Sequence, residues 1–193
     1  RGLVLDLNDF SGGDLPAMNY IGKAIENFKT TGKPVIAFAN NYSQGQYFLA
    51  SFADQIYLNP NGQVLIQGLT QENLYYKDLL DKLAVTPHIF RVGTYKSAVE
   101  PFLRNDMSPE AKANANQWLN GMWQSYLQTV SANRHVTTDK FAPDAKQYLT
   151  ELKALKGDAT AYALQRKWVT ELVTNLDLEQ KLIALFGRNS EGE

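Results

Sequence analysis

Cysteine is absent from this sequence, and histidine is scarce. The 193 residues include no cysteine and two histidines, His88 and His135, which lie far apart and form no metal-ligand motif. Without cysteine the chain has neither a disulfide nor a thiolate nucleophile. A histidine-rich metal centre is not predicted either. We therefore expect no cofactor and no metal, and any chemistry has to come from oxygen and nitrogen side chains.

An excess of charge and long apolar runs are also missing. The sequence has 19 Lys and Arg against 20 Asp and Glu, which leaves a formal net charge of −1. No block of basic residues could follow a phosphate backbone, so nucleic acid is not an expected partner. The longest apolar runs, such as residues 34–39, are far too short to span a bilayer.

The two ends of the sequence suggest that it is part of something longer. It opens on Arg1 rather than methionine, and residues 2–7 already have the apolar pattern of a strand. Residues 188–193 are polar and contain glycine, which is typical of a linker or a cleavage site. We therefore expect a piece of a longer protein, from which an anchor or a targeting segment has been removed.

Strands and helices alternate in the first half of the sequence. Apolar runs of strand length occupy residues 3–7 and 34–39, and residues 17–28 between them have helical spacing and are closed by Gly32. Strand, helix and strand in this order imply a parallel pair. Further strands are predicted at residues 54–58, 63–69 and 85–92, with a helix at residues 72–83. This order predicts an α/β fold.

Lys96 lies in a loop that we expect at the carboxyl end of the strand at residues 85–92. Gly93 ends that strand, and ligands and reactions gather at this edge of open α/β sheets. The nearest acidic residue is Glu100, so Lys96 lacks an obvious local ion-pair partner. A buried lysine loses its proton more readily, and a neutral amine can act as general base for a serine. The alternative is that Lys96 is a solvated surface charge.

Two earlier turns could serve the same chemistry. Residues 40–47 join an apolar strand to an apolar helix through a polar turn that contains Ser43, a geometry that exposes the nucleophile of many hydrolases. The alternative is that Ser43 and Asn41 cap the helix. Gly12 and Gly13 could direct backbone N–H groups at an oxyanion, or they could form an ordinary turn.

The second half of the sequence is predicted to be entirely helical. Ser108 caps and Pro109 starts a helix to about Asn133, whose aromatic stripe is typical of a core or an interface. Further helices are predicted at residues 143–155, 160–173 and 178–186. We divide the chain into a core domain, residues 1–107, which contains the lysine loop, and a helical extension, residues 108–193, which acts as an oligomerisation arm and a linker.

Three segments, residues 2–13, 32–39 and 93–98, together resemble the signal peptide peptidase A family, also called protease IV. The resemblance covers essentially the whole chain and is close to the amino-terminal half of the long, duplicated form of Gram-negative bacteria. It implies a Clp protease or crotonase-like fold of stacked β-β-α units followed by a helical arm. It also implies a membrane-anchored serine peptidase that uses a Ser-Lys dyad to degrade cleaved signal peptides on the periplasmic side of the bacterial inner membrane.

The resemblance assigns the family's general-base lysine to Lys96. The family's nucleophile lies in an Ala-Ser-Gly-Gly-Tyr turn, and the matching turn here has Gln44 in the nucleophile's place, with Ser43 one residue early. Ser43 is therefore not assigned as the nucleophile. In the duplicated form the amino-terminal half is expected to supply the lysine, and the absent carboxy-terminal half the serine. Four such chains are expected to form a bowl-shaped homotetramer that acts on peptides.

Three hypotheses follow. In the first, this chain is the lysine-donating half of a Ser-Lys peptidase and is inactive without its carboxy-terminal half. In the second, which Gln44 motivates, the chain is a non-catalytic scaffold or oligomerisation domain of a crotonase-like assembly. In the third, the chain is a complete acyl-transfer enzyme that uses Ser43.

Overall fold

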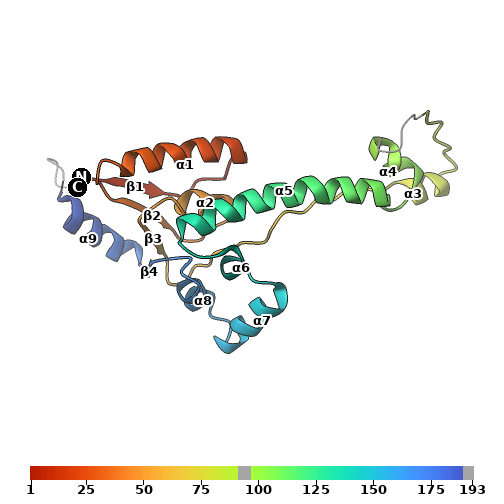
Figure 1. Cartoon of the computed structure of the whole chain (residues 1–193). Coiled ribbons are helices and arrows are strands. Elements are labelled where there is room, and N and C mark those ends of the chain that lie inside the picture. The colour runs from red at the N-terminus through yellow and green to blue at the C-terminus, as the bar shows by residue number, and fades with distance from the viewer. Residues whose placement is uncertain (91–96, 189–193) are drawn as a thin grey trace. The chain divides into compact units, whose positions relative to one another are not determined.

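The computed structural model of the chain describes residues 1–90 and 97–188 and has the predicted α/β architecture (Figure 1). Its four strands are all parallel and form one sheet in the order β1-β2-β3-β4. They are β1 (Leu3–Asp6), β2 (Val35–Ala39), β3 (Gln55–Leu58) and β4 (Glu171–Leu172). The first three strands and the predicted parallel pairing are thereby confirmed.

The chain forms two compact units. The first contains Arg1–Gln67 and the described residues from Tyr126 onward, and the second contains Gly68–Ser125. The whole sheet belongs to the first unit, whereas the described part of the second unit has only helices and irregular segments. The division that the sequence suggested between residues 107 and 108 stays a prediction.

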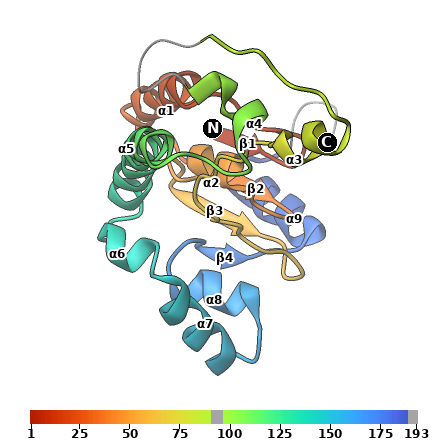
Figure 2. The same ribbon diagram turned by 90° about the vertical axis from the view of Figure 1, so that its right-hand side faces the viewer.

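Helices cover both faces of the sheet in the first unit (Figure 2). Helix α1 (Leu15–Lys29) begins at Asp14, whose carboxylate accepts a hydrogen bond from the Ala17 amide at 2.8 Å. Helix α9 (Asn175–Phe186) lies on the opposite face, where its apolar side packs against buried side chains of β2 and β3. All five residues of β2 are buried, which explains why this strand is a continuous apolar run.

Helix α2 (Gln44–Ala50) lies deep in the core of the first unit, and its last four residues are buried. The Tyr47 hydroxyl donates a hydrogen bond to the Trp168 carbonyl at 2.5 Å. The Tyr47 ring also contacts the rings of Tyr42, Phe141 and Trp168. Burial raises the pKa of Tyr47, so its hydroxyl keeps its proton and remains a donor at neutral pH.

Three helices after α5 complete the first unit on the side of this aromatic cluster. They are α6 (Thr138–Phe141), α7 (Ala145–Ala154) and α8 (Ala159–Gln165). Asp144 and Asp158 cap α7 and α8, because each carboxylate accepts a backbone N–H in the first turn of its helix. The Trp168 indole donates to the Phe141 carbonyl at 3.0 Å, which ties the end of α6 to the chain after α8.

The described part of the second unit contains α3 (Lys77–Lys82), the 3₁₀ helix η1 (Ser97–Val99), α4 (Glu100–Leu103) and the first part of α5 (Pro109–Asn133). The predicted start of α5 is confirmed, since Ser108 Oγ accepts the Ala111 amide at 3.1 Å. The Ser108 amide donates to the buried Glu100 carboxylate at 3.1 Å. None of the helices in the described ranges has the length and the apolar character needed to cross a membrane.

Two predicted strands are wrong where the structure describes them. Residues 85–90 form no strand, and residues 63–69 contribute only an isolated bridge between Val64 and Tyr42. Val85 and Phe90 are exposed, so the β-branched and aromatic side chains that suggested the first strand have no sheet to pack on. The helix predicted at residues 72–83 is also shorter than expected, because only Lys77–Lys82 is helical.

The helix predicted at residues 160–173 is wrong in its second half. Helix α8 ends at Gln165, and Lys167 takes a left-handed backbone with φ of 58°. The chain then forms β4 beside β3, where the Thr170 amide donates to the Ile56 carbonyl at 2.8 Å. These backbone groups pair with a strand and therefore cannot continue a helix.

Gly62→Ala tests the close approach of the turn after β3 to the end of β2. A Cβ at residue 62 would overlap the Asn40 carbonyl oxygen and lie 2.9 Å from Leu58 Cδ1. Because a backbone carbonyl cannot move aside cheaply, we expect the free energy of unfolding to fall by about 1–3 kcal/mol, measured by urea denaturation. Gly121→Ala is the control: nothing lies within 4 Å of the added Cβ, and alanine in a helix adds up to about 1 kcal/mol. Equal stability of the two variants would contradict this packing.

Candidate functional site

The carboxyl ends of β1 and β2 meet at one edge of the sheet, as they must in a parallel pair. The Asn40 amide, just after β2, donates to Asn8 Oδ1 at 2.8 Å. The Gln46 side-chain amide donates to the Leu7 carbonyl at 2.7 Å. These bonds hold the loop after β1 against the turn that leads into α2, which we call the strand-end elbow (residues 40–46).

Ser43 is the N-cap of α2, which confirms the capping alternative for this residue. Its Oγ accepts a hydrogen bond from the Gln46 amide at 3.3 Å, and Gln46 Oε1 accepts one from the Ser43 amide at 2.7 Å. This reciprocal pair is a capping box. Asn41 does not cap the helix but accepts the Gln63 amide at 3.1 Å. The Ser43 hydroxyl is therefore used in holding the helix start.

Gln44 occupies the position next to the cap, where a nucleophile would stand. Its Oε1 accepts a hydrogen bond from the Gln67 amide at 3.2 Å, and its carbonyl accepts one from the Tyr126 hydroxyl at 3.1 Å. A neutral amide is neither a nucleophile nor a general base in acyl transfer. Residue 44 is therefore held in place by hydrogen bonds, and its side chain cannot act as nucleophile or base.

The strand-end elbow contains no acid or base that could activate a hydroxyl. Its side chains are mainly neutral amides and Ser43, and its one ionisable group is Tyr42. Burial raises the pKa of Tyr42 well above its usual value, and its hydroxyl donates to the Tyr57 carbonyl at 2.9 Å. Across the described ranges, no group of three His, Cys, Asp or Glu could hold a metal ion. The elbow by itself can form hydrogen bonds with a ligand but cannot supply a base.

The glycine loop after β1 lies against the elbow. Gly12 has φ of +103°, a backbone conformation that L side chains rarely adopt. A Cβ built on Gly45 would lie 3.5 Å from Gly12 Cα, so the two backbones approach closely. The fold thus brings together two of the segments that the sequence singled out, the loop of Gly12 and Gly13 and the turn of Ser43.

Lys96, the predicted general base, lies outside the described residues. The described chain resumes at Ser97 in η1, and α4 and the start of α5 follow. The role of Lys96 therefore stays a prediction.

Sequence reasoning missed two residues that hold the elbow. Gln46 could have been found, because Ser43 followed three residues later by glutamine is the capping-box pattern. Tyr126, which donates to the Gln44 carbonyl from α5, had no such signal. Its contact joins residues 82 positions apart, and only the folded chain brings them together.

A parallel α/β sheet with a glycine loop and a strand-to-helix elbow at its carboxyl edge is typical of α/β enzymes that act at this edge. Residues 27–183 match the pattern of peptidase family S49, so the chain belongs to that family.

Similar proteins agree with this assignment. The chain is 68% identical to Protease 4 of Haemophilus influenzae over 193 residues, which are all of this chain and 31% of that protein. It is 52% identical to Protease 4 of Salmonella typhi over 186 residues, 96% of this chain and 30% of that protein. It is 24% identical to the chloroplastic serine protease SPPA of Arabidopsis thaliana over 131 residues, 68% of this chain and 19% of that protein. The family resemblance seen in the sequence is thus confirmed, and the chain spans about a third of the length of the two bacterial relatives.

Ser43→Ala tests the capping role. Loss of the side-chain acceptor leaves the Gln46 amide unpaired, and we expect a loss of about 1 kcal/mol in the free energy of unfolding. Ser43→Asn is the matched control, because asparagine caps equally well and has no hydroxyl nucleophile. On the function proposed below, both variants of the complete protein keep peptidase activity. If both variants fold but lose activity, Ser43 has a catalytic role and capping does not account for it.

Proposed function

We propose that this chain is the lysine-donating half of a serine peptidase, with Lys96 as general base and the nucleophilic serine on a carboxy-terminal half of the full-length protein. The observation that supports this most directly is Gln44. It stands at the strand-end elbow where the family pattern has its serine, and it is held there by Gln67 and Tyr126. The relatives of which this chain covers about 30% are named as proteases, which leaves room for a nucleophile elsewhere in the protein.

The proposed reaction needs a lysine whose amine is neutral. The amine takes the proton of the serine hydroxyl while the serine oxygen attacks the peptide carbonyl. The proton then passes to the leaving amine as the peptide bond breaks and the acyl-enzyme forms. In the second stage the lysine amine takes a proton from water while the water oxygen attacks the ester carbonyl. The bond between the acyl carbon and the serine oxygen then breaks, and the lysine ammonium returns the proton to that oxygen. The substrates on this proposal are cleaved signal peptides.

The proposed architecture is Clp protease or crotonase-like, with stacked β-β-α units and a helical arm beyond residue 107. The parallel α/β sheet is compatible with it, although the described strands and helices alternate as β1-α1-β2-α2-β3. A long helix, α5, follows.

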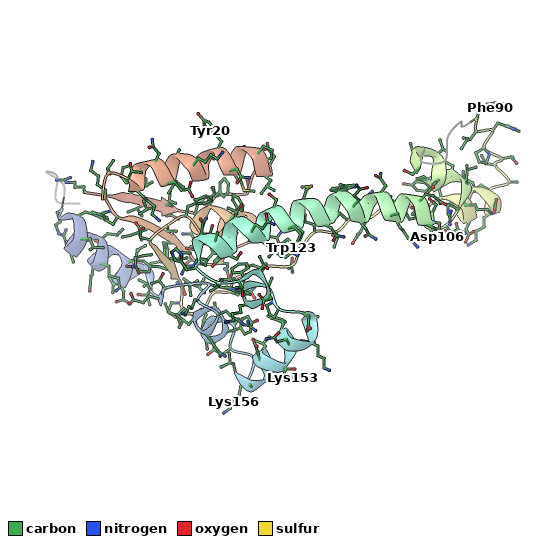
Figure 3. The ribbon with its side chains drawn as sticks, in the orientation of Figure 1. Tyr20, Phe90, Asp106, Trp123, Lys153 and Lys156 are labelled. Atoms are coloured by element: carbon green, nitrogen blue, oxygen red, sulfur yellow. The ribbon has the colours of Figure 1, made fainter. Side chains whose placement is uncertain are left out.

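Exposed apolar side chains in the second unit support the proposal that this chain works within a larger assembly. Phe90 is 99% exposed and projects outward (Figure 3), and Leu74 and Leu83 are 74% and 63% exposed. Large exposed apolar side chains gathered in one unit are typical of surfaces that another chain covers. On this proposal four copies form a homotetramer on the periplasmic side of the bacterial inner membrane, held there by an anchor outside this chain.

A second candidate function is a non-catalytic scaffold of such an assembly. The absence of an ionisable base from the strand-end elbow favours it. On this reading the second unit supplies contacts only, and Lys96 has no part in the reaction.

Labelling by a fluorophosphonate serine probe separates the candidates. We expect the full-length protein to be labelled. This chain alone should not be labelled at a comparable rate, and neither should the full-length Lys96→Ala variant. Loss of the general base should lower the rate of labelling and of peptide hydrolysis by about 10²–10⁴-fold. Lys82→Ala, an exposed lysine in α3, is the control and should keep the full rate.

Unchanged labelling of Lys96→Ala would favour the scaffold reading. Labelling of this chain alone would show a nucleophile within it and overturn the split site. Gel filtration and circular dichroism of each variant show whether the fold and the assembly are intact.

A further inference from the structure

A basic hollow of about 790 Å³ lies in the first unit, away from the strand-end elbow. The ends of α5, α6 and α8 and one side of α7 form it, and these helices are grouped together in Figure 2. Its volume is within the range of about 300–1,000 Å³ that is usual for small-molecule sites. Its lining residues are His135, Val136, Thr137, Lys140, Gln147, Glu151, Gln165, Arg166 and Lys167.

The one carboxylate in the lining is already neutralised. Glu151 accepts hydrogen bonds from two nitrogens of Arg166, at 2.8 Å for Nε, and from the Gln147 side-chain amide at 3.0 Å. The Arg166 hydrogen bond lowers the pKa of Glu151, so the pair stays ionised at neutral pH. A further Arg166 nitrogen donates to the Lys140 carbonyl at 2.8 Å. Arg166 and Glu151 therefore form a fixed floor with no net charge.

Lys140 and Lys167 line the hollow without a salt bridge among the described residues. Neither forms a salt bridge with a carboxylate in the described part of the chain. Asp139 lies next to Lys140 in sequence and outside the lining; the hydrogen bond of the Thr137 side chain is the main cause that lowers the pKa of Asp139, and the Lys140 charge contributes less. The lining therefore has a net positive charge at neutral pH.

Two of the lining residues have a backbone that glycine would adopt more easily. His135 and Lys167 have φ of 54° and 58°, and each follows the end of a helix, α5 or α8. Glycine is the usual residue at such a position because it has no Cβ. A lysine near a helix end interacts favourably with the helix dipole, which accounts in part for Lys167 at this position. The helix dipole does not explain why both residues, His135 and Lys167, line the same hollow.

We propose that the basic hollow binds the phosphate group of a small soluble molecule between Lys140 and Lys167. A tetrahedral phosphate has several acceptor oxygens and up to two negative charges, so one phosphate has enough acceptors for two ammonium groups. Two leucines of α7, the exposed Leu149 and the half-buried Leu152, line a separate notch and do not line the hollow. Val136 is the one aliphatic side chain in the lining of the hollow, and the leucine pair of α7 lies in the separate notch, which favours a soluble ligand over a lipid with long acyl chains. The proposal is independent of the peptidase function.

The test is a calorimetric titration of the full-length protein with glycerol 3-phosphate and, separately, with inorganic phosphate. Lys140→Gln and Lys167→Gly should each weaken binding about tenfold, as loss of one charge-assisted contact would. Lys167→Gly suits the left-handed backbone, so the variant should fold. Thermal unfolding of each variant checks this.

Lys156→Gly is the matched control. Lys156 is also a lysine with a left-handed backbone, φ of 56°, and it lies beyond the end of α7 (Figure 3). It lines the separate notch rather than the basic hollow, so its loss should leave phosphate binding unchanged.

Three results would overturn the proposal. They are no binding of either phosphate compound, equal weakening by Lys156→Gly, and no weakening by either hollow variant. Vesicles of phosphatidylcholine with and without phosphatidylglycerol form the last arm. Binding to the anionic vesicles alone, dependent on Lys140 and Lys167, would replace the soluble ligand by a lipid headgroup.

Discussion

The burial of α2 is the constraint on which the rest of the first unit depends. The Tyr47 hydroxyl bonds to the Trp168 carbonyl across 121 positions of sequence, and its ring is enclosed by other aromatic rings. This contact holds the chain after α8 where it can form β4 beside β3. The strand-end elbow is thus positioned from inside the core, and its polar residues only complete the turn.

The strand-end elbow joins a strand to a helix through a tight turn but contains no group that could act as nucleophile and base together. Ser43 and Gln46 close the capping box, and Gln44 bonds to the chain at Gln67. Gly12 and Gly45 let the two loops approach closely. Every polar group named here has a partner within the fold, which explains why the turn is stable without a serine at residue 44. On the proposed function, the turn is retained for its structural role while the nucleophile lies elsewhere.

The two units differ in what stabilises them. The first has a sheet covered on both faces and an aromatic cluster, whereas few of the described side chains of the second unit are buried. The buried residues of the second unit include the polar Glu100 and Ser108, and the Ser108 amide donates a hydrogen bond to the Glu100 carboxylate. A unit with little apolar burial and many exposed apolar side chains gains stability when another surface covers them. The chain belongs to peptidase family S49, and its bacterial relatives are about three times as long. Such relatives contain further chain that could supply a covering surface.

The sequence by itself determined the local features: the apolar run of β2, the cap at Ser108, the parallel order of the first strands and the family. Each depends on residues close together in the chain, where periodicity and capping act. Only the tertiary structure decided that residues 85–90 form no strand and that the chain after Gln165 becomes β4. It also decided that Tyr126 supports Gln44 and that Lys140 and Lys167 share a hollow. These outcomes depend on partners far away in sequence, and local propensity contains no information about which distant surface a segment will meet.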